Sequence, residues 1–156
     1  MPAITAKPEA SFEVAVEPNP IAADQLLLTG VPISTDSATY TAADLAAAVD
    51  VPAGCSLTVE TAAGEPLTAA APLGTGCVAV VRNDHASARY ILLVKGDVLG
   101  TGELNIAQIY RMAADLTDRD PLTGIYSLAG KVTSSPGPVN IADLVGVARM
   151  LIEADD

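Results

Sequence analysis

Apolar and polar positions alternate along the first part of the chain as they do in β-strands. Phe12, Val14 and Val16 are separated by small or acidic residues, and this period of two predicts a half-buried strand. Three later segments have strand-like composition bounded by turn residues: "DQLLLTGVP", "SLTVETAAGEPLTA" with a turn at Ala63-Gly64, and "CVAVVRNDHASARYILLVK" with a tip near Asp84-His85. The last two are expected to be hairpins.

A single helix interrupts these strands. In "TAADLAAAVD", Thr41 is a good N-cap, and Asp44 three places later completes a capping box. The preceding residues 1–11 are rich in Pro, Ala and Thr and carry no pattern, which is typical of a linker. We therefore expect a linker stub over 1–11, followed by a mostly antiparallel β module over 12–95 with one short helix near 41–49.

After Gly96 the pattern changes to a helical period, and the helical part repeats. "NIAQI" from Asn105 recurs as "NIADL" from Asn140, 35 residues later. Each asparagine is a good N-cap, and Gln108 and Asp143 stand where they can close capping boxes. In both copies apolar residues follow at i, i+3, i+4 and i+7: Ile109, Met112, Ala113 and Leu116, then Leu144, Val147, Ala148 and Leu151. Two helices, over about 105–116 and 140–152, are expected to pack together.

The duplicated loop–helix pattern resembles the dockerin family. A glycine precedes each asparagine by three places, and the loop "GDVLGTGELN" follows the last strand of the β module without a linker. The resemblance covers about residues 96–153 and implies a pair of EF-hand-like loop–helix halves that binds a cohesin domain. The β-rich region resembles the accessory modules that precede some dockerins. The expected fold class is therefore α+β in two modules, 12–95 and 96–153.

The resemblance also assigns calcium-ligand places in the first loop. They fall, from the first place to the twelfth, on Asp97, Thr101, Glu103 (through its backbone carbonyl), Asn105 and Gln108. Two residues depart from the family pattern. Leu99 cannot ligate calcium through an alkyl side chain, and Gln108 replaces the acid that closes the cage.

The second loop departs further. Ser134, Asn140 and Asp143 take the third, ninth and twelfth places, whereas Val132 or Lys131 replaces the first aspartate. Because calcium affinity follows the charge and number of the ligands, we expect calcium binding to be weak or lost, with no site tighter than roughly 10⁻⁵ M.

In dockerins the cohesin contacts centre on the two residues after the ninth loop place. Here these are Ile106 and Ala107, and in the copy Ile141 and Ala142. Further candidates on the same face are Ala113, Ala114, Asp118, Ala148, Arg149 and Glu153. The alternative is that both isoleucines pack on the opposite loop as core residues.

Composition excludes several classes of partner. The net charge of −11 argues against nucleic acid and anionic membrane surfaces, since both are polyanions. The longest apolar runs are shorter than the roughly 18 residues of a membrane span. The N-terminus lacks the plan of a signal peptide, so we expect a cytosolic protein or a fragment of a longer secreted chain. The resemblance favours the second, at the cell surface or outside the cell, and we expect a monomer when no partner is bound.

The sequence does not decide whether the two cysteines form a disulfide. If "EPLTAAAP" is the middle strand of a meander, Cys55 and Cys77 lie at the same sheet edge, roughly 10 Å apart, which is too far for a disulfide. The alternatives are therefore two buried thiols or a disulfide between them.

Enzymatic functions find little support in the sequence. The single histidine, His85, falls in an expected hairpin tip, where a general base has no positioned partner. Two function classes remain. One is a non-catalytic docking module that binds a cohesin and attaches a larger secreted protein to an assembly. The other is a structural terminal unit, in which the helix pair packs on its own β module and binds no cohesin.

Overall fold

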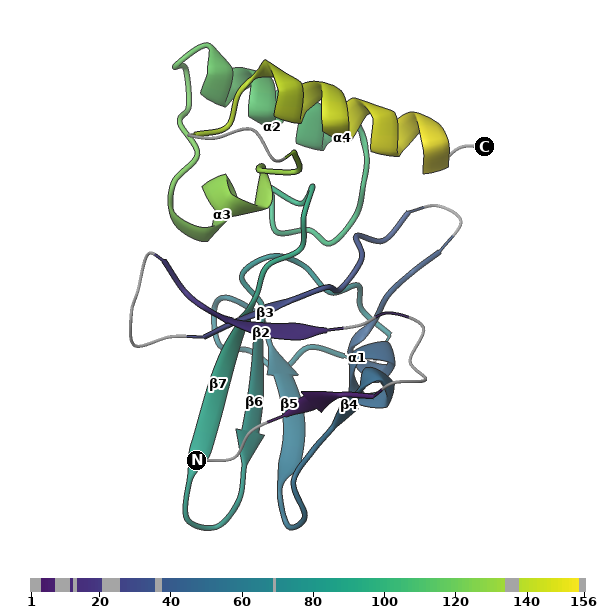
Figure 1. Cartoon of the computed structure of the whole chain (residues 1–156), viewed down its shortest axis with the longest axis vertical. Coiled ribbons are helices and arrows are strands. Elements are labelled where there is room, and N and C mark those ends of the chain that lie inside the picture. The colour runs from purple at the N-terminus through teal and green to yellow at the C-terminus, as the bar shows by residue number, and fades with distance from the viewer. Residues whose placement is uncertain are drawn as a thin grey trace.

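The computed structural model describes residues 4–7, 12, 14–20, 26–35, 38–68, 70–133 and 138–154. The chain has an α+β fold. Figure 1 shows the sheet at one end of the molecule and the helices of the second half at the other.

A mixed five-stranded sheet forms the first end. Its strand order is β2-β3-β7-β6-β5, and β3 and β7 are its one parallel pair among the described residues. The other neighbours are antiparallel, so the expectation of a mostly antiparallel region is confirmed. The strands are β2 (Ala15–Pro18), β3 (Leu26–Thr29), β5 (Ser56–Glu60), β6 (Val78–Arg82) and β7 (Ser87–Leu92).

Part of the expected linker belongs to the folded region. Thr5–Ala6 form β1, which pairs antiparallel with β4 (Val49–Asp50), and Ile4 is buried. Burial of an isoleucine and a strand pairing together fix this segment on the fold. The other parts of the expected linker, residues 1–3 and 8–11, lie outside the described residues.

The first predicted strand is displaced along the chain. Phe12 and Val14 are buried as expected, but they precede β2, whereas Val16 within it is 41% exposed. β2 is an edge strand, paired only with β3 among the described strands. The alternating pattern therefore identified Phe12 and Val14 as buried residues but placed the strand too early in the chain.

The two cysteines lie at opposite ends of a strand pair. β5 pairs directly with β6, with Ser56 opposite Arg82 and Glu60 opposite Val78. Cys55 precedes β5 and Cys77 precedes β6, so the antiparallel pairing separates them, and both thiols are free. The expected hairpin at Ala63-Gly64 is reduced to a single bridge between Glu60 and Pro66. The meander used to estimate the cysteine separation is therefore wrong.

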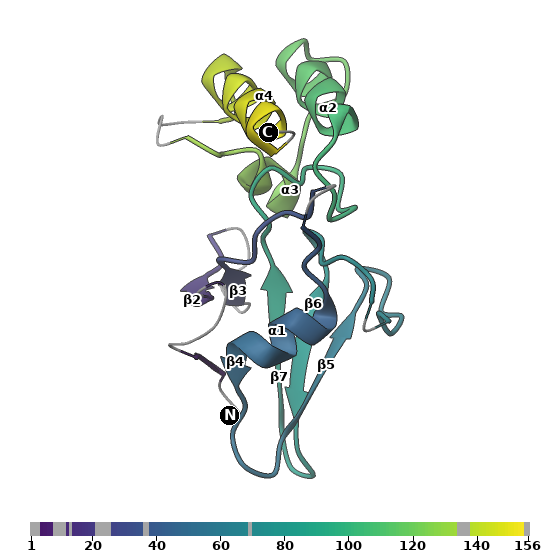
Figure 2. The same ribbon diagram turned by 90° about the vertical axis from the view of Figure 1, so that its right-hand side faces the viewer.

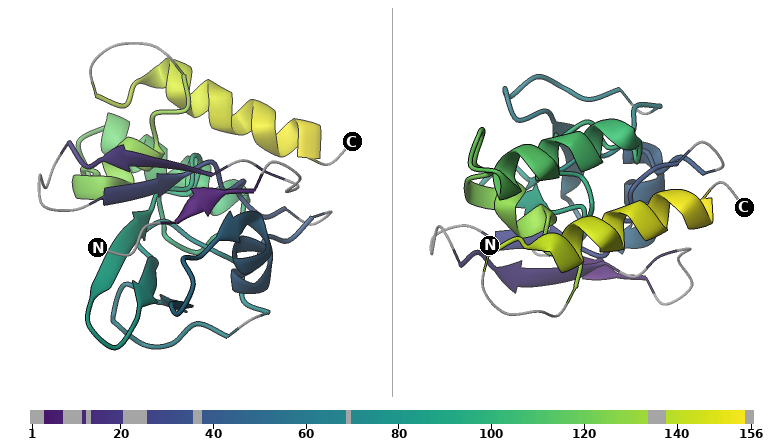
Figure 3. Two further views of the ribbon diagram at one scale, coloured as in Figure 1. Left: turned by 60° about the horizontal axis from the view of Figure 1, so that its bottom comes forward. Right: turned by 90° about the horizontal axis from the view of Figure 1, so that it is seen from above.

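The helices are α1 (Ala42–Ala48), α2 (Ile106–Leu116), α3 (Gly124–Ala129) and α4 (Ile141–Ala154). α1, α2 and α4 follow the predicted local signals, whereas α3 has no counterpart among the expected elements. Thr41 and Asp44 form the expected capping box on α1. α2 and α4 contact each other, and Figure 3 shows them side by side, running in opposite directions. Their facing stripes are buried, with Met112 and Val147 both 0% exposed.

One buried hydrophobic cluster runs through both ends of the molecule. It includes Leu73 and Leu92 from the β-rich part and Val98, Met112 and Val147 from the helical part. Figure 2 shows α2, α3 and α4 stacked beyond the ends of the strands. None of the helices in the described ranges is both long and apolar enough to span a membrane.

The first loop touches the β-rich part through its glycine turn. Gly102 has φ +78°, and its carbonyl accepts a hydrogen bond from Ser34 N at 3.0 Å. A Cβ on Gly102 would lie 2.5 Å from the carbonyl oxygen of Leu73. The position therefore requires glycine for two reasons: its left-handed conformation and the close approach of another backbone segment.

Gly102→Ala tests this contact. We expect it to lower the free energy of unfolding by about 2–4 kcal/mol, because it adds a clash with backbone to left-handed strain. Gly64→Ala is the matched control, since Gly64 has φ +88° and a Cβ added there would meet no atom within 4 Å. It should cost only about 1 kcal/mol. Equal losses in urea unfolding would contradict the close approach.

Candidate functional site

The carboxylate of Asp97, at the first place of the first loop, is 0% exposed. It accepts five hydrogen bonds from nitrogen. Oδ2 accepts from the backbone N–H groups of Thr75 and Gly102, both at 2.9 Å. Oδ1 accepts from Gly100 N at 2.9 Å, Thr101 N at 3.1 Å and Gln108 Nε2 at 2.9 Å. The negative charge is thus solvated by N–H groups of its own loop, of α2 and of the β-rich part.

The side chain of Gln108, at the twelfth place, fills the interior of the same loop and is 0% exposed. Its Nε2 lies 2.9 Å from Asp97 Oδ1, 3.3 Å from Thr101 Oγ1 and 2.9 Å from the carbonyl oxygen of Glu103. Its Oε1 accepts from Val98 N at 2.9 Å and Leu99 N at 3.1 Å. Gln108 does not reach back to Asn105 N, so the expected capping box on α2 is wrong.

The predicted ligands of the first loop are therefore partly gathered. Asp97, Thr101 and the carbonyl of Glu103 converge on one point, as the resemblance implies. Asn105 instead caps α2, its Oδ1 accepting from Ala107 N at 2.9 Å. Leu99 is 38% exposed and brings no oxygen.

These residues do not fit a calcium ion. Calcium requires six to eight oxygen ligands, whereas the convergence point in this loop has three oxygens and a hydrogen-bond-donating nitrogen between them. Both Asp97 oxygens are already engaged by N–H groups. Nor do three His, Cys, Asp or Glu side chains gather anywhere within the described ranges in a way that could hold a metal.

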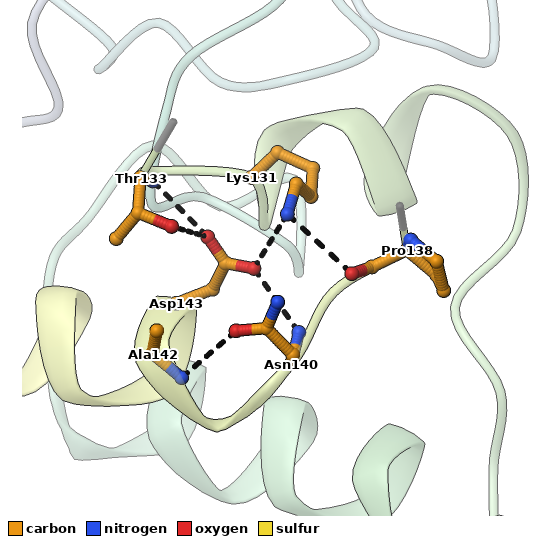
Figure 4. Close-up of polar contacts among 6 residues, drawn as sticks. All are labelled: Lys131, Thr133, Pro138, Asn140, Ala142 and Asp143. Carbon is orange, nitrogen blue, oxygen red and sulfur yellow. Dashed lines mark hydrogen bonds and ion pairs between the residues drawn. The ribbon is translucent and has the colours of Figure 1, made fainter. Parts of the chain in front are cut away.

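Asp143 organises the second loop in a different way (Figure 4). Its side chain is 0% exposed. Oδ1 accepts from Thr133 N at 3.0 Å and Thr133 Oγ1 at 2.7 Å, while Oδ2 accepts from Asn140 N at 3.0 Å and Lys131 Nζ at 3.0 Å. The Lys131 ammonium also lies 3.4 Å from the carbonyl oxygen of Pro138. The expected return of Asp143 to the backbone of Asn140 is confirmed.

These partners hold Asp143 in its charged form. Burial raises the pKa of the carboxyl, but hydrogen bonds from Thr133 Oγ1, the Lys131 ammonium and the backbone N–H groups of Asn140 and Thr133 outweigh burial. Together they lower the pKa from 3.8 to about 2.

Asn140 Oδ1 accepts from Ala142 N at 2.9 Å. Ser134, the predicted third-place ligand, lies outside the described residues.

The outer face of the helix pair carries the predicted docking residues. Ile106 is 52% exposed and Ile141 is 65% exposed, and Ala107, Ala142, Arg149 and Glu153 are exposed too. Ala113, Ala114 and Ala148 are half-buried beside them, while Asp118 lies beyond the end of α2. The alternative in which the isoleucines pack as core is not what their exposure indicates.

Sequence reasoning missed three further apolar residues on this face. Tyr110 is 71% exposed, Val145 43% and Ile152 65%. Tyr110 and Val145 each follow an exposed isoleucine by four residues, so the i, i+4 rule would have found them. Ile152 lies eleven residues after Ile141, which returns it to the same helix face.

Gly146 gave a second overlooked signal. A Cβ there would lie 2.7 Å from Val132 Cγ2, so this glycine lets the segment holding Lys131 and Thr133 lie close against α4. An isolated glycine within a helical pattern often marks such a close approach. The partners of Asp143 could have been sought there.

The pH dependence of stability tests the Asp143 cluster. A carboxyl whose pKa falls from 3.8 to about 2 on folding stabilises the protein above about pH 3.8. That contribution, about 2 kcal/mol, is lost as pH falls from about 4 to about 2. Urea unfolding of wild type and Asp143→Asn should therefore differ most near neutrality and converge at low pH. A difference that stays constant over this range would contradict the assignment.

Comparisons with known proteins complete the description of the site. The chain was compared with protein-family models, with curated proteins and with solved structures, and no match was found in any of the three.

Proposed function

We propose that the helical part is a non-catalytic docking module that binds a cohesin domain through the outer face of α2 and α4. In this function it attaches a larger secreted protein to an assembly outside the cell or at its surface. The proposal combines the dockerin-like repeat of the sequence with the surface properties of the two helices. It involves neither nucleic acid nor membrane insertion.

The observation that carries the proposal is the concentration of exposed apolar side chains on these two helices. In the described part of the chain, seven large hydrophobic residues are exposed: Val16, Leu99, Ile106, Tyr110, Ile141, Val145 and Ile152. Five of these seven belong to α2 or α4. Exposed apolar side chains gathered on one pair of helices are typical of a surface that a partner covers.

The surface shape of α4 supports a partner contact at its first turns. A hollow of about 360 Å³ is lined there by Thr133, Ile141, Ala142, Val145, Gly146 and Arg149. Three of these lining residues, Ile141, Ala142 and Arg149, are among the docking residues that the dockerin resemblance implies. An aromatic or aliphatic side chain of the partner would fit such an apolar hollow with a cation at its edge.

The antiparallel arrangement supports two related contact sites. Ile106-Ala107 begin α2 and Ile141-Ala142 begin α4, and the helices run in opposite directions (Figure 3). The two dyads therefore lie at opposite ends of the pair, related by about half a turn. A partner that binds one dyad could bind the other after this rotation.

The structural terminal unit remains the second candidate function. It is favoured by the single hydrophobic cluster that joins the helices to the β-rich part, and by the hydrogen bond that Asp97 accepts from Thr75 N. Such packing uses the inner side of the helical part. It leaves the face with Ile106 and Ile141 open, so it does not account for the exposed residues.

Binding to a panel of cohesins would separate the two functions. Wild type should bind at least one cohesin. Ile106→Asp or Ile141→Asp should each weaken binding by a few-fold if the other dyad can substitute. The double variant should weaken it by about 30-fold or more, as expected when an apolar anchor is lost. Both positions begin a helix, where aspartate is compatible with the helix dipole, so the helical circular dichroism should persist.

Val16→Asp is the matched control, since it introduces the same charge at an exposed apolar residue on β2. It should leave cohesin binding unchanged. If the double variant binds as wild type does, the docking face is wrong. If no cohesin binds wild type, or the double variant unfolds, the structural terminal unit is favoured.

A further inference from the structure

We infer that, in each loop, a nitrogen of the chain itself occupies the place that calcium takes in an EF-hand-like loop. In the first loop this nitrogen is Gln108 Nε2, and in the second it is Lys131 Nζ. In each loop, described groups at places that would bind the ion are then held together without a metal. The inference concerns the loops alone and is independent of cohesin binding.

The first loop shows the substitution most completely. In an EF-hand loop, the first and fifth side chains and the seventh carbonyl bind the ion. Here the corresponding groups are Asp97 Oδ1, Thr101 Oγ1 and the carbonyl of Glu103, and all three lie within 3.3 Å of Gln108 Nε2. An amide NH₂ has two hydrogens, so three converging acceptors form a cage around the nitrogen rather than a simple pair of hydrogen bonds.

The orientation of the Gln108 amide is fixed by its other contacts. Oε1 accepts from the N–H groups of Val98 and Leu99. Exchanging oxygen and nitrogen would place Oε1 against Asp97 Oδ1 and the carbonyl of Glu103, and would set the NH₂ against two N–H donors. The hydrogen-bond network therefore places the nitrogen at the centre.

The second loop uses a charged nitrogen. The Lys131 ammonium lies 3.0 Å from Asp143 Oδ2 and 3.4 Å from the carbonyl of Pro138 (Figure 4). Asp143 stands at the twelfth place of the loop and Pro138 at the seventh. A calcium ion held there would contact the same two groups.

The two sequence departures are explained by the same contacts. Glutamine at the twelfth place keeps the length of the usual acid but ends in a hydrogen-bond donor. Its side chain therefore reaches the centre of the loop, as the acid would, and its Nε2 takes the place of the ion. Lys131 directly precedes Val132, which stands at the first place of the second loop when Asp143 stands at the twelfth, and its ammonium contacts Asp143 and the carbonyl of Pro138. Each loop has thus replaced calcium with a different residue.

Thermal unfolding with calcium or a chelator tests the first loop. The melting temperature of wild type should be the same in about 10 mM CaCl₂ and in EGTA, because only a bound ligand shifts it. Gln108→Glu removes the central NH₂ and restores the acid beside Asp97. It should melt at least about 5 °C lower in EGTA, and calcium should raise its melting temperature by about 4 °C.

Gln108→Leu is the matched control, since it loses the same hydrogen bonds but supplies no carboxylate. It should be destabilised in EGTA and should not respond to calcium. The inference is overturned for this loop if EGTA lowers the melting temperature of wild type, or if Gln108→Glu responds to calcium no more than Gln108→Leu does. If Gln108→Glu does not fold with or without calcium, the double-mutant cycle in the second loop tests the inference.

A double-mutant cycle tests the second loop. Lys131→Met removes the ammonium and keeps the length of the side chain, and should lower the melting temperature by about 5 °C. In an Asp143→Asn background the same change should cost less than about 2 °C, because the carboxylate it serves is gone. Lys95→Met, at an exposed lysine, controls for the loss of one positive charge and should have little effect. Equal losses in both backgrounds would overturn the role of Lys131.

Discussion

The structure depends on one buried charge. Asp97 is placed at the point where the last strand gives way to the helical part, and its carboxylate has no access to water. A charge in that position is tolerated only when hydrogen bonds replace its hydration. It receives them from Thr75 in the β-rich part, from the turn at Gly100–Gly102 and from Gln108 on α2. One carboxylate thus sets the turn, orients α2 and ties both ends of the molecule together.

The polar loops and the apolar face then have separate roles. Polar atoms of the loops point inward and are satisfied there, since no buried side-chain nitrogen or oxygen within the described ranges lacks a partner. The apolar residues that begin each helix point outward, because the residues at the third helical position, Gln108 and Asp143, hold the loops from the inside. In our proposal this arrangement presents Ile106 and Ile141 to a partner on a rigid frame. The loops of this frame are cross-linked by the hydrogen bonds of Asp97, Gln108 and Asp143.

Local signals predicted α1, α2 and α4 but not α3, and non-local pairings limited the prediction of the sheet. The Thr41–Asp44 box, the Asn105 cap and the stripes through Met112 and Val147 depend on residues within two helical turns. The strand order could not be read in this way. No residue near Pro66 in the sequence indicates that β5 pairs with β6 rather than with the segment after the Ala63-Gly64 turn. The parallel pairing of β3 with β7 joins segments about 60 residues apart.

The candidate site shows the same division. The loop positions of Asp97, Thr101 and Glu103 were implied by the dockerin resemblance, and groups of all three lie around Gln108 Nε2. That Gln108 fills the centre could not be predicted, because the pattern records only what is missing from a calcium cage and not which group takes its place. The sequence pattern presents Lys131 only as a replacement for an aspartate, whereas its contact with Asp143 depends on how closely Gly146 lets its segment approach α4.

Hydrogen exchange of the loop amides would test the central claim most directly. The N–H groups of Thr75, Gly100, Thr101 and Gly102 all donate to Asp97. If Asp97 and Gln108 hold the loop without metal, these amides exchange slowly and at the same rates in EGTA and in calcium. Exchange that is fast in EGTA and becomes slow only when calcium is added would contradict it.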